Sequence, residues 1–310
     1  MNRIVATIRV GELPVSAVVS PNSKWVYVAN VNSANVSVID TATNNVTFSI
    51  PISGKPTALP ITPDGSQLYV AFEAGVFYGG IALINTSTNT QTTMIAVGGS
   101  PTNLALSPNG TTLWVSDGDI VLVDTATNQV SGTIPTDSAS PGELVFTPDG
   151  AYVYVLCGLD GTGYPCGLLQ INTATEASVQ LEWGNLTLAS GLAITPNGKK
   201  LYFSDLPPNY NKHPHARQVS AFSIVTDKVE ANVHLSYPGL VGLCAVTPNG
   251  KYIYFAETHE IILLDVTTNK IVDTPIKTNF PAYLTIAPNG KYAYVLGAND
   301  VKVVDISPAE

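Results

Sequence analysis

Charged residues are scarce in this chain of 310 residues. Asp, Glu, Lys and Arg together make up 12% of it, against roughly 25% in typical soluble domains. The 14 Lys and Arg residues are scattered, and the formal net charge is −9. Binding to nucleic acid needs clustered basic residues facing the phosphates, so the sequence excludes nucleic acid as an expected partner.

Long apolar runs and familiar catalytic motifs are also missing. No apolar stretch approaches the ~20 residues of a membrane span, and the start "MNRIVATIRVG" is too polar for a signal peptide. We therefore expect a soluble protein, with the cytoplasm and a secreted or cell-surface location both left open. The patterns G-x-S-x-G, H-E-x-x-H and C-x-x-C-H and a Gly-rich phosphate loop do not occur.

Cysteine occurs three times, and two of the three bracket an irregular segment. Cys157 and Cys166 have eight residues between them. A disulfide there would stabilise the protein by roughly 2–3 kcal/mol and would favour an oxidising compartment. A free pair in a reducing cytoplasm is the alternative, and the sequence does not decide between them. Cys244 falls in the apolar register of a strand, where we expect it in the core.

A turn of the form Ser/Thr-Pro-Asn/Asp-Gly dominates what the sequence does contain. With small departures it recurs seven times, at Pro21, Pro63, Pro108, Pro148, Pro196, Pro248 and Pro288. An apolar strand precedes each turn, and an aromatic-Val strand such as "WVYVAN" or "QLYVAF" follows it. A third strand ends in "VIDTATNN" or a relative, and a fourth completes the unit. Seven such units predict an all-β, seven-bladed β-propeller with four antiparallel strands per blade.

The same residues carry a family resemblance. "YVAN", "YVAF" and "YVLC", each after one of these Pro-Asn/Asp turns, resemble the YVTN repeats of surface-layer-type and lactonase-type seven-bladed propellers. The resemblance covers the full length and implies the same fold. It implies no single function, because that repeat serves binding proteins, scaffolds and enzymes alike.

The two ends of the chain predict how the ring closes. The start, "NRIVATI", is similar to "NKIVDTPI", the fourth strand of the sixth unit, while the chain stops after a third strand at "VVDISPAE". We therefore expect the N-terminal strand to complete the last blade, which removes open sheet edges. Residues 1–310 then form a single propeller domain.

Length variation is confined to one part of each unit, the connection between the second and third strands. In a propeller these connections share one rim with the loops that cross from blade to blade. The longest insertions, residues 157–167 and 205–218, belong to adjacent blades. Insertions on one face of a repeat protein usually mark its binding face. We expect a ligand site at this mouth of the central channel.

Titratable residues gather near this mouth. The position that closes each second strand is a carboxylate in three blades, at Asp117, Asp205 and Glu257. Converging carboxylates and histidines suit one divalent cation or acid–base chemistry; alternatively, they accept backbone hydrogen bonds at strand corners. The candidate catalytic residues are Asp205, His213, Arg217, Glu257 and His259.

A second set of candidates concerns substrate binding. Aligned positions at the entrance of the inner strands, including Asn103, Glu143 and Tyr283, are expected to line the channel below the mouth. Glu143 stands out because an enclosed acid needs a partner, which can be a ligand, a cation or water. The candidate substrate-binding residues are Tyr78, Asn103, Asp117, Glu143, Tyr164, Trp183, Tyr210, His215 and Tyr283.

Two functions remain open from the sequence. The first is an enzyme or enzyme-like binder that acts on a small organic molecule at the channel mouth by acid–base chemistry, with or without one divalent cation. Lactone hydrolysis, lyase and cyclase reactions all fit. The alternative is a non-catalytic module of the cell envelope that binds a protein or glycan across the same rim.

Overall fold

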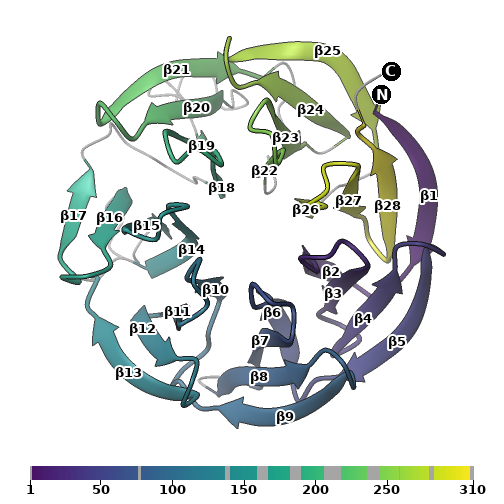
Figure 1. Ribbon diagram of the computed structural model, residues 1–310, viewed down its shortest axis with the longest axis vertical. Coiled ribbons are helices and arrows are strands. Elements are labelled where there is room, and N and C mark those ends of the chain that lie inside the picture. The colour runs from purple at the N-terminus through teal and green to yellow at the C-terminus, as the bar shows by residue number, and fades with distance from the viewer. Residues whose placement is uncertain are drawn as a thin grey trace.

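Seven sheets stand around a central axis (Figure 1). The computed structural model describes residues 2–75, 78–136, 140–158, 167–181, 190–205, 218–235, 244–257, 259–278 and 283–307. Within these residues, 28 strands form seven four-stranded antiparallel sheets. The seven-bladed propeller predicted from the repeats is confirmed.

The first four blades follow the chain from the inner strand to the outer one. Blade 1 contains β2 (Pro14–Val19), β3 (Trp25–Asn30), β4 (Asn35–Asp40) and β5 (Asn45–Pro51). Blade 2 contains β6 (Lys55–Ala58), β7 (Gln67–Glu73), β8 (Gly79–Asn85) and β9 (Thr90–Ile95). Blade 3 contains β10 (Asn103–Leu106), β11 (Thr112–Asp117), β12 (Asp119–Asp124) and β13 (Gln129–Ile134). Blade 4 contains β14 (Ser140–Phe146), β15 (Tyr152–Gly158), β16 (Leu168–Asn172) and β17 (Ser178–Leu181).

The remaining blades repeat this order until the ring closes. Blade 5 contains β18 (Ser190–Ile194), β19 (Lys200–Asp205), β20 (Gln218–Ser223) and β21 (Lys228–His234). Blade 6 contains β22 (Cys244–Val246), β23 (Tyr252–Ala256), β24 (Glu260–Asp265) and β25 (Lys270–Lys277). Blade 7 contains β26 (Tyr283–Ile286), β27 (Tyr292–Leu296), β28 (Asp300–Asp305) and, as its outer strand, β1 (Arg3–Arg9).

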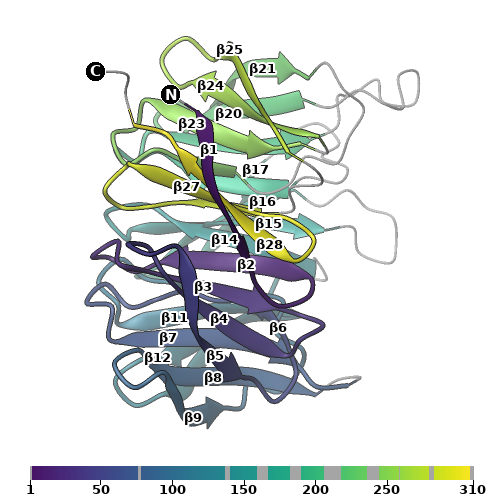
Figure 2. The same ribbon diagram turned by 90° about the vertical axis from the view of Figure 1, so that its right-hand side faces the viewer.

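Closure of the ring depends on β1. This strand runs antiparallel to β28, with Arg3 opposite Asp305 and Arg9 opposite Asp300, and the two lie side by side in Figure 2. Ile8 of β1 is buried in a cluster that also contains Val28 of blade 1 and Val301 of blade 7. The expected completion of the last blade by the N-terminal strand is confirmed.

The apolar core is divided among the seven junctions between blades. Each of the seven buried clusters within the described residues joins two neighbouring sheets, as Tyr27 of blade 1 and Val70 of blade 2 do. The middle strands are covered on both faces, so β3 and β7 are nearly continuous in buried residues. Apolar burial at these junctions is the main stabilising term of the ring.

The repeated turns lie on one rim, and local hydrogen bonds explain their composition. In blade 5 the Thr195 hydroxyl donates to Asn197 Oδ1 (2.7 Å) and accepts from Lys200 N (3.0 Å). Gly198 has a φ of 68°, which glycine adopts without steric cost. In blade 3 the Thr125 hydroxyl donates to the Gly110 carbonyl (2.6 Å), so the third-strand turns lie on the same rim as the Pro-Asn-Gly turns.

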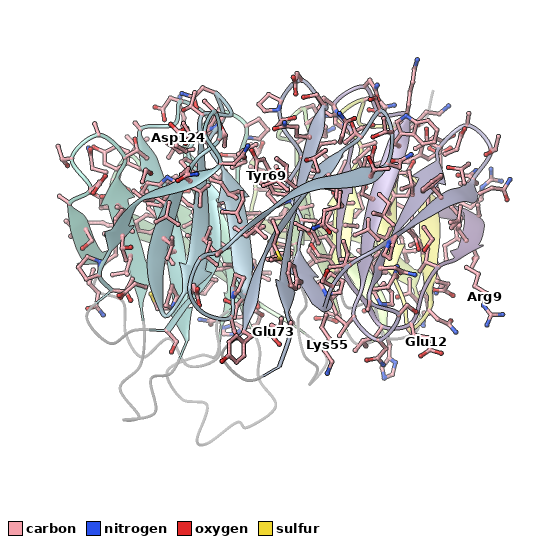
Figure 3. The ribbon with its side chains drawn as sticks, turned by 90° about the horizontal axis from the view of Figure 1, so that it is seen from below. Arg9, Glu12, Lys55, Tyr69, Glu73 and Asp124 are labelled. Atoms are coloured by element: carbon pink, nitrogen blue, oxygen red, sulfur yellow. The ribbon has the colours of Figure 1, made fainter. Side chains whose placement is uncertain are left out.

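The opposite rim carries the second-to-third-strand and crossing connections. Figure 3 shows Asp124 on the turn rim and Glu12, Lys55 and Glu73 on this opposite rim. The strand ends therefore place the repeated turns on one rim and the connections of variable length on the other, while residues 159–166 and 206–217 of the two longest connections lie outside the described residues.

A hydrogen bond between neighbouring repeats explains why aromatic residues and Asn recur together. The Tyr202 hydroxyl of blade 5 donates to Asn269 Oδ1 of blade 6 (2.8 Å), and that of Tyr254 donates to Asn2 Oδ1 beside β1 (2.9 Å). Both asparagines have positive φ, 51° and 57°, a conformation that Asn tolerates better than most residues. The aromatic strand of one blade is thereby fixed to the turn of the next.

We predict that Tyr254→Phe lowers the free energy of unfolding by about 0.5–1.5 kcal/mol. The substitution removes the hydrogen bond between blade 6 and Asn2, which precedes the strand β1 that completes blade 7. Urea unfolding at neutral pH measures the change. The exposed Tyr78 is the control: Tyr78→Phe should change the free energy by less than about 0.5 kcal/mol. Equal effects of the two substitutions would contradict a stabilising role for the bond to Asn2.

Candidate functional site: the central cavity

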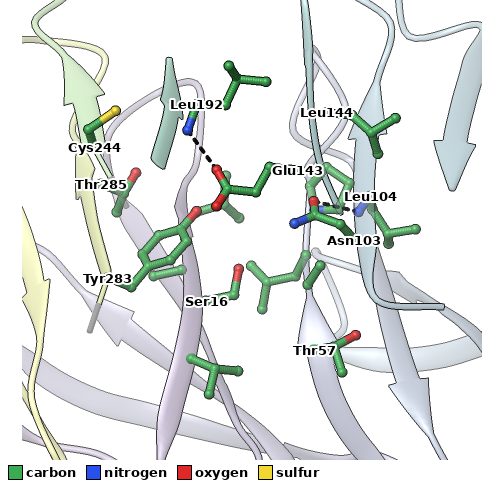
Figure 4. A pocket seen from close by; sticks show the side chains of 16 residues that line it. Ser16, Thr57, Asn103, Leu104, Glu143, Leu144, Leu192, Cys244, Tyr283 and Thr285 are labelled. Atoms are coloured by element: carbon green, nitrogen blue, oxygen red, sulfur yellow. Dashed lines mark hydrogen bonds between the residues drawn. The ribbon is translucent and has the colours of Figure 1, made fainter. Parts of the chain in front are cut away.

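A cavity of about 300 Å³ occupies the central channel, and the inner strands of all seven blades line it. Its polar lining comprises Ser16, Thr57, Asn103, Glu143, Tyr283 and Thr285 (Figure 4). Cys244 contributes a thiol, and most of the remaining lining is aliphatic. Asn103, Cys244 and Tyr283 are the first residues of their strands, whereas in blades 1 and 2 the lining extends to Val18 and Pro60. The cavity therefore extends from the entry of the inner strands past their middle.

β-Bulges in the inner strands aim several of these residues. In β14, Pro141 pairs with Cys157 and Leu144 with Val155, so Gly142 and Glu143 together oppose one residue. In β18, Ser190 pairs with Ser204 and Ala193 with Tyr202, which leaves Gly191 and Leu192 opposite one residue. A bulge interrupts the ladder and redirects side chains and N–H groups.

The two bulges bind each other across the junction of blades 4 and 5. Glu143 Oε1 accepts a hydrogen bond from Gly191 N (3.0 Å), and Oε2 accepts one from Leu192 N (2.7 Å). Gly191 has a φ of 73°, so a side chain at this position would be strained. The carboxylate is therefore held in one orientation at the cavity wall.

Three ionisable groups of the cavity influence one another. Burial raises the pKa of Glu143, and the hydrogen bonds from Leu192 and Gly191 offset part of that rise. Burial also raises the pKa of Tyr283, opposed by a hydrogen bond with Ser16 and reinforced by the charges of Glu143 and Cys244. Burial, with the charge of Glu143, raises the pKa of the Cys244 thiol. Figure 4 shows the Tyr283 hydroxyl directed toward Glu143.

Asn103 presents a donor to the same space. Its Oδ1 accepts a hydrogen bond from Leu104 N (2.9 Å), and its amide nitrogen points into the cavity (Figure 4). The wall thus combines a carboxyl, a phenol, an amide donor and hydroxyls. Such a set can orient a small polar molecule and exchange a proton with it.

The structure brings together three of the residues predicted from sequence, Asn103, Glu143 and Tyr283. Asp117 lies outside the set that lines the cavity. Its carboxylate accepts a hydrogen bond from Ser100 N (2.8 Å), and burial raises its pKa while the N–H groups of Ser100 and Gly99 oppose that rise. For Asp117 the structure therefore matches the alternative stated from the sequence, in which the carboxylate accepts backbone hydrogen bonds at a strand corner.

Glu257 and His259 lie together in the turn between β23 and β24, away from the cavity lining. Glu257 is 4% exposed, and its backbone N–H donates to the Glu260 carbonyl (2.8 Å). Burial, reinforced by the charge of Glu260, raises the pKa of Glu257 to about 7. The backbone carbonyl of His259 accepts from Thr278 N (2.9 Å).

Tyr78 is 74% exposed and is not part of the cavity lining.

Other predicted residues lie wholly or partly outside the described part of the chain. Asp205 ends β19 opposite Gln218, but its side chain is not described. Cys157 is a buried free thiol, while Cys166 lies outside the described residues. Six further candidates lie there too: Tyr164, Trp183, Tyr210, His213, His215 and Arg217. Among the side chains that are described, no three His, Cys, Asp or Glu residues come together as a metal site.

Sequence reasoning missed Thr57, Thr285 and the cavity position of Cys244. Thr285 could have been found, because it is two residues beyond Tyr283 and alternate residues of a strand share a face. Thr57 could not, because a bulge separates it from the regular register: Pro56 pairs with Phe72 and Ala58 with Ala71.

Comparison with known proteins supports the fold alone. No family model and no curated protein matches the chain, so the YVTN resemblance remains an expectation. Among the solved structures, "Kuenenia stuttgartiensis Hydrazine Synthase" is similar, with a TM-score of 0.85 and 20% identity over 96% of this chain and 97% of that chain. In the described residues no helix has the length and apolar character of a membrane span.

We predict a pH-dependent loss of stability from Glu257. Its pKa is raised from about 4.3 in an unfolded chain to about 7, so folding favours the protonated form. The resulting stability is present below the unfolded value and is lost as the pH rises through about 7. Glu257→Gln should flatten the curve of unfolding free energy against pH over this window.

Glu260→Gln is the matched control for that prediction. It removes a neighbouring negative charge that contributes to the raised pKa, so the loss of stability should end at a lower pH. Urea unfolding at a series of pH values measures all three proteins. Parallel curves for wild type and Glu257→Gln would contradict the raised pKa.

Proposed function

We propose that the protein binds a small organic molecule in the central cavity and acts on it by proton transfer through Glu143. The observation that carries the proposal is a carboxyl group at the cavity wall, fixed by the N–H groups of Gly191 and Leu192. A volume of about 300 Å³ is at the small end of the range for ligand pockets, roughly 300–1,000 Å³.

The chemistry follows from the state of this carboxyl. A pKa raised by burial brings a carboxylic acid nearer to neutral pH, where it can both donate and accept a proton. Tyr283 offers a second hydroxyl near the same point, held by Ser16. Ring-opening hydrolysis, elimination and cyclisation can each use such a group as general acid or base.

One observation favours the non-catalytic alternative. Both carboxylate oxygens of Glu143 already accept hydrogen bonds from blade 5, and a structural link between two blades would need no more than this. In that case the cavity would bind a ligand without converting it, or bind none.

Conversion of a bound ligand separates the two functions. A panel of anionic, neutral and cationic small molecules is screened for compounds that raise the thermal unfolding temperature, and the hits are followed with the protein by proton NMR. We predict that at least one hit is converted and that Glu143→Gln slows conversion by about 10²-fold or more. Binding without any conversion would leave a small-molecule binder and contradict the proton transfer, whereas absence of any hit would favour the alternative, a non-catalytic module that binds a protein or glycan across the rim.

Asp117→Asn is the matched control. It makes the same chemical change in a carboxylate that also accepts two backbone N–H groups but lies outside the cavity lining, so conversion should be unchanged. Thr285→Val tests the cavity without touching the Glu143 link and should weaken binding of the hits. Hits that bind equally to wild type, Glu143→Gln and Thr285→Val would contradict the cavity as the site.

A further inference from the structure

The ionisable side chains that line the cavity are all acids, which can carry only negative charge. Among the described residues that form its wall, Glu143, Tyr283 and Cys244 can each lose a proton to become an anion, and none of the others is Lys, Arg or His. The whole chain carries a formal net charge of −9. Neither the wall nor the protein as a whole therefore favours an anionic ligand.

The Glu143 carboxylate has unused capacity for donors. Each of its oxygens accepts one backbone hydrogen bond, from Gly191 N and from Leu192 N respectively, and a carboxylate oxygen has room for a second. Glu143 is half-buried, and an ionised carboxylate that loses part of its contact with water is costly unless hydrogen bonds or opposite charge compensate it. A ligand that brings positive charge and N–H groups would supply what this wall lacks.

The rest of the lining suits an organic cation better than a metal ion. Divalent cations in proteins take several oxygen ligands, with further carboxylates for tight binding, and the described residues supply no such cluster. The aromatic ring of Tyr283 can instead attract an ammonium group, and Leu104, Leu144 and Leu192 offer apolar surface to a carbon frame.

We propose that the ligand of this cavity is a small organic ammonium ion whose N–H groups donate to the Glu143 carboxylate. The inference rests on the proposed function and names its substrate class. Ammonium recognition requires Glu143 to be ionised. The titratable groups that face it are Tyr283 from β26 and Cys244 from β22, and the pKa values of both are raised. They remain neutral at pH 7.

This arrangement has a distinctive proton linkage. Burial raises the pKa of Glu143, and a bound cation would lower it. At pH values between the lowered and the raised pKa, binding must release a proton, and affinity must increase with pH until the raised value is passed. A neutral ligand that accepts a hydrogen bond from protonated Glu143 would show the opposite dependence.

Three probes of similar shape and different charge test the proposal. Benzylamine, benzyl alcohol and benzoate share one ring and differ in charge, and isothermal titration calorimetry measures their binding to the full chain. We expect benzylammonium to bind roughly tenfold or more tightly than the alcohol or the anion, and Glu143→Gln to remove roughly that preference. Asp117→Asn should retain it, and ammonium chloride and potassium chloride should not compete at equal concentration.

The outcomes separate this inference from the proposed function. Tighter binding of benzyl alcohol or benzoate would overturn the ammonium assignment and leave the cavity as a ligand site. Binding of no probe, with no compound of the wider panel bound either, would overturn both. If Glu143→Gln does not fold, titrations of the wild-type protein in buffers of different ionisation enthalpy decide: absence of proton release, or affinity that falls with rising pH, would overturn the inference.

Discussion

Apolar packing between neighbouring blades is the constraint on which the rest of the structure depends. Each sheet buries both faces of its middle strands against the sheets beside it, so no blade has a complete core alone. The strand β1 lets this packing continue across the two ends of the chain. Seven sheets packed in this way leave the innermost strands facing a common axis, and the central cavity is a consequence of the ring.

The candidate site uses the same junctions. Glu143 and the N–H groups that hold it belong to adjacent blades, and Cys244 of blade 6 donates its thiol hydrogen to the carbonyl of Gly191. The peptide group between Gly191 and Leu192 thus donates its N–H to Glu143 and accepts from Cys244 through its carbonyl. Three consecutive blades are tied together at the wall where the ionisable groups gather, so the geometry of the site and the stability of the ring are coupled.

The fold was predictable because the same locally hydrogen-bonded turns and strand patterns recur in every blade. Turns such as Thr195-Pro196-Asn197-Gly198 close their own hydrogen bonds, and the spacing of seven of them fixes the number of blades. The alignment of inner strands also pointed to Asn103, Glu143 and Tyr283. The partners of Glu143 could not be predicted, because they depend on two bulges that break the repeat. Asp117 shows the converse, since a carboxylate at a repeated corner position can bind backbone N–H groups alone.

A direct titration of Glu143 tests whether the cavity is bordered by a carboxyl group whose negative charge no positive group balances. Carbon-13 NMR of protein labelled at the glutamate carboxyls, with Glu143→Gln used to assign the resonance, gives the pKa in the empty protein. We predict a value above that of an ordinary glutamate, about 4.3, because burial outweighs the two backbone hydrogen bonds. An ordinary or lowered value would mean that hydrogen bonds, water or a positive group already compensate the carboxylate, and would contradict the proposed role of the cavity.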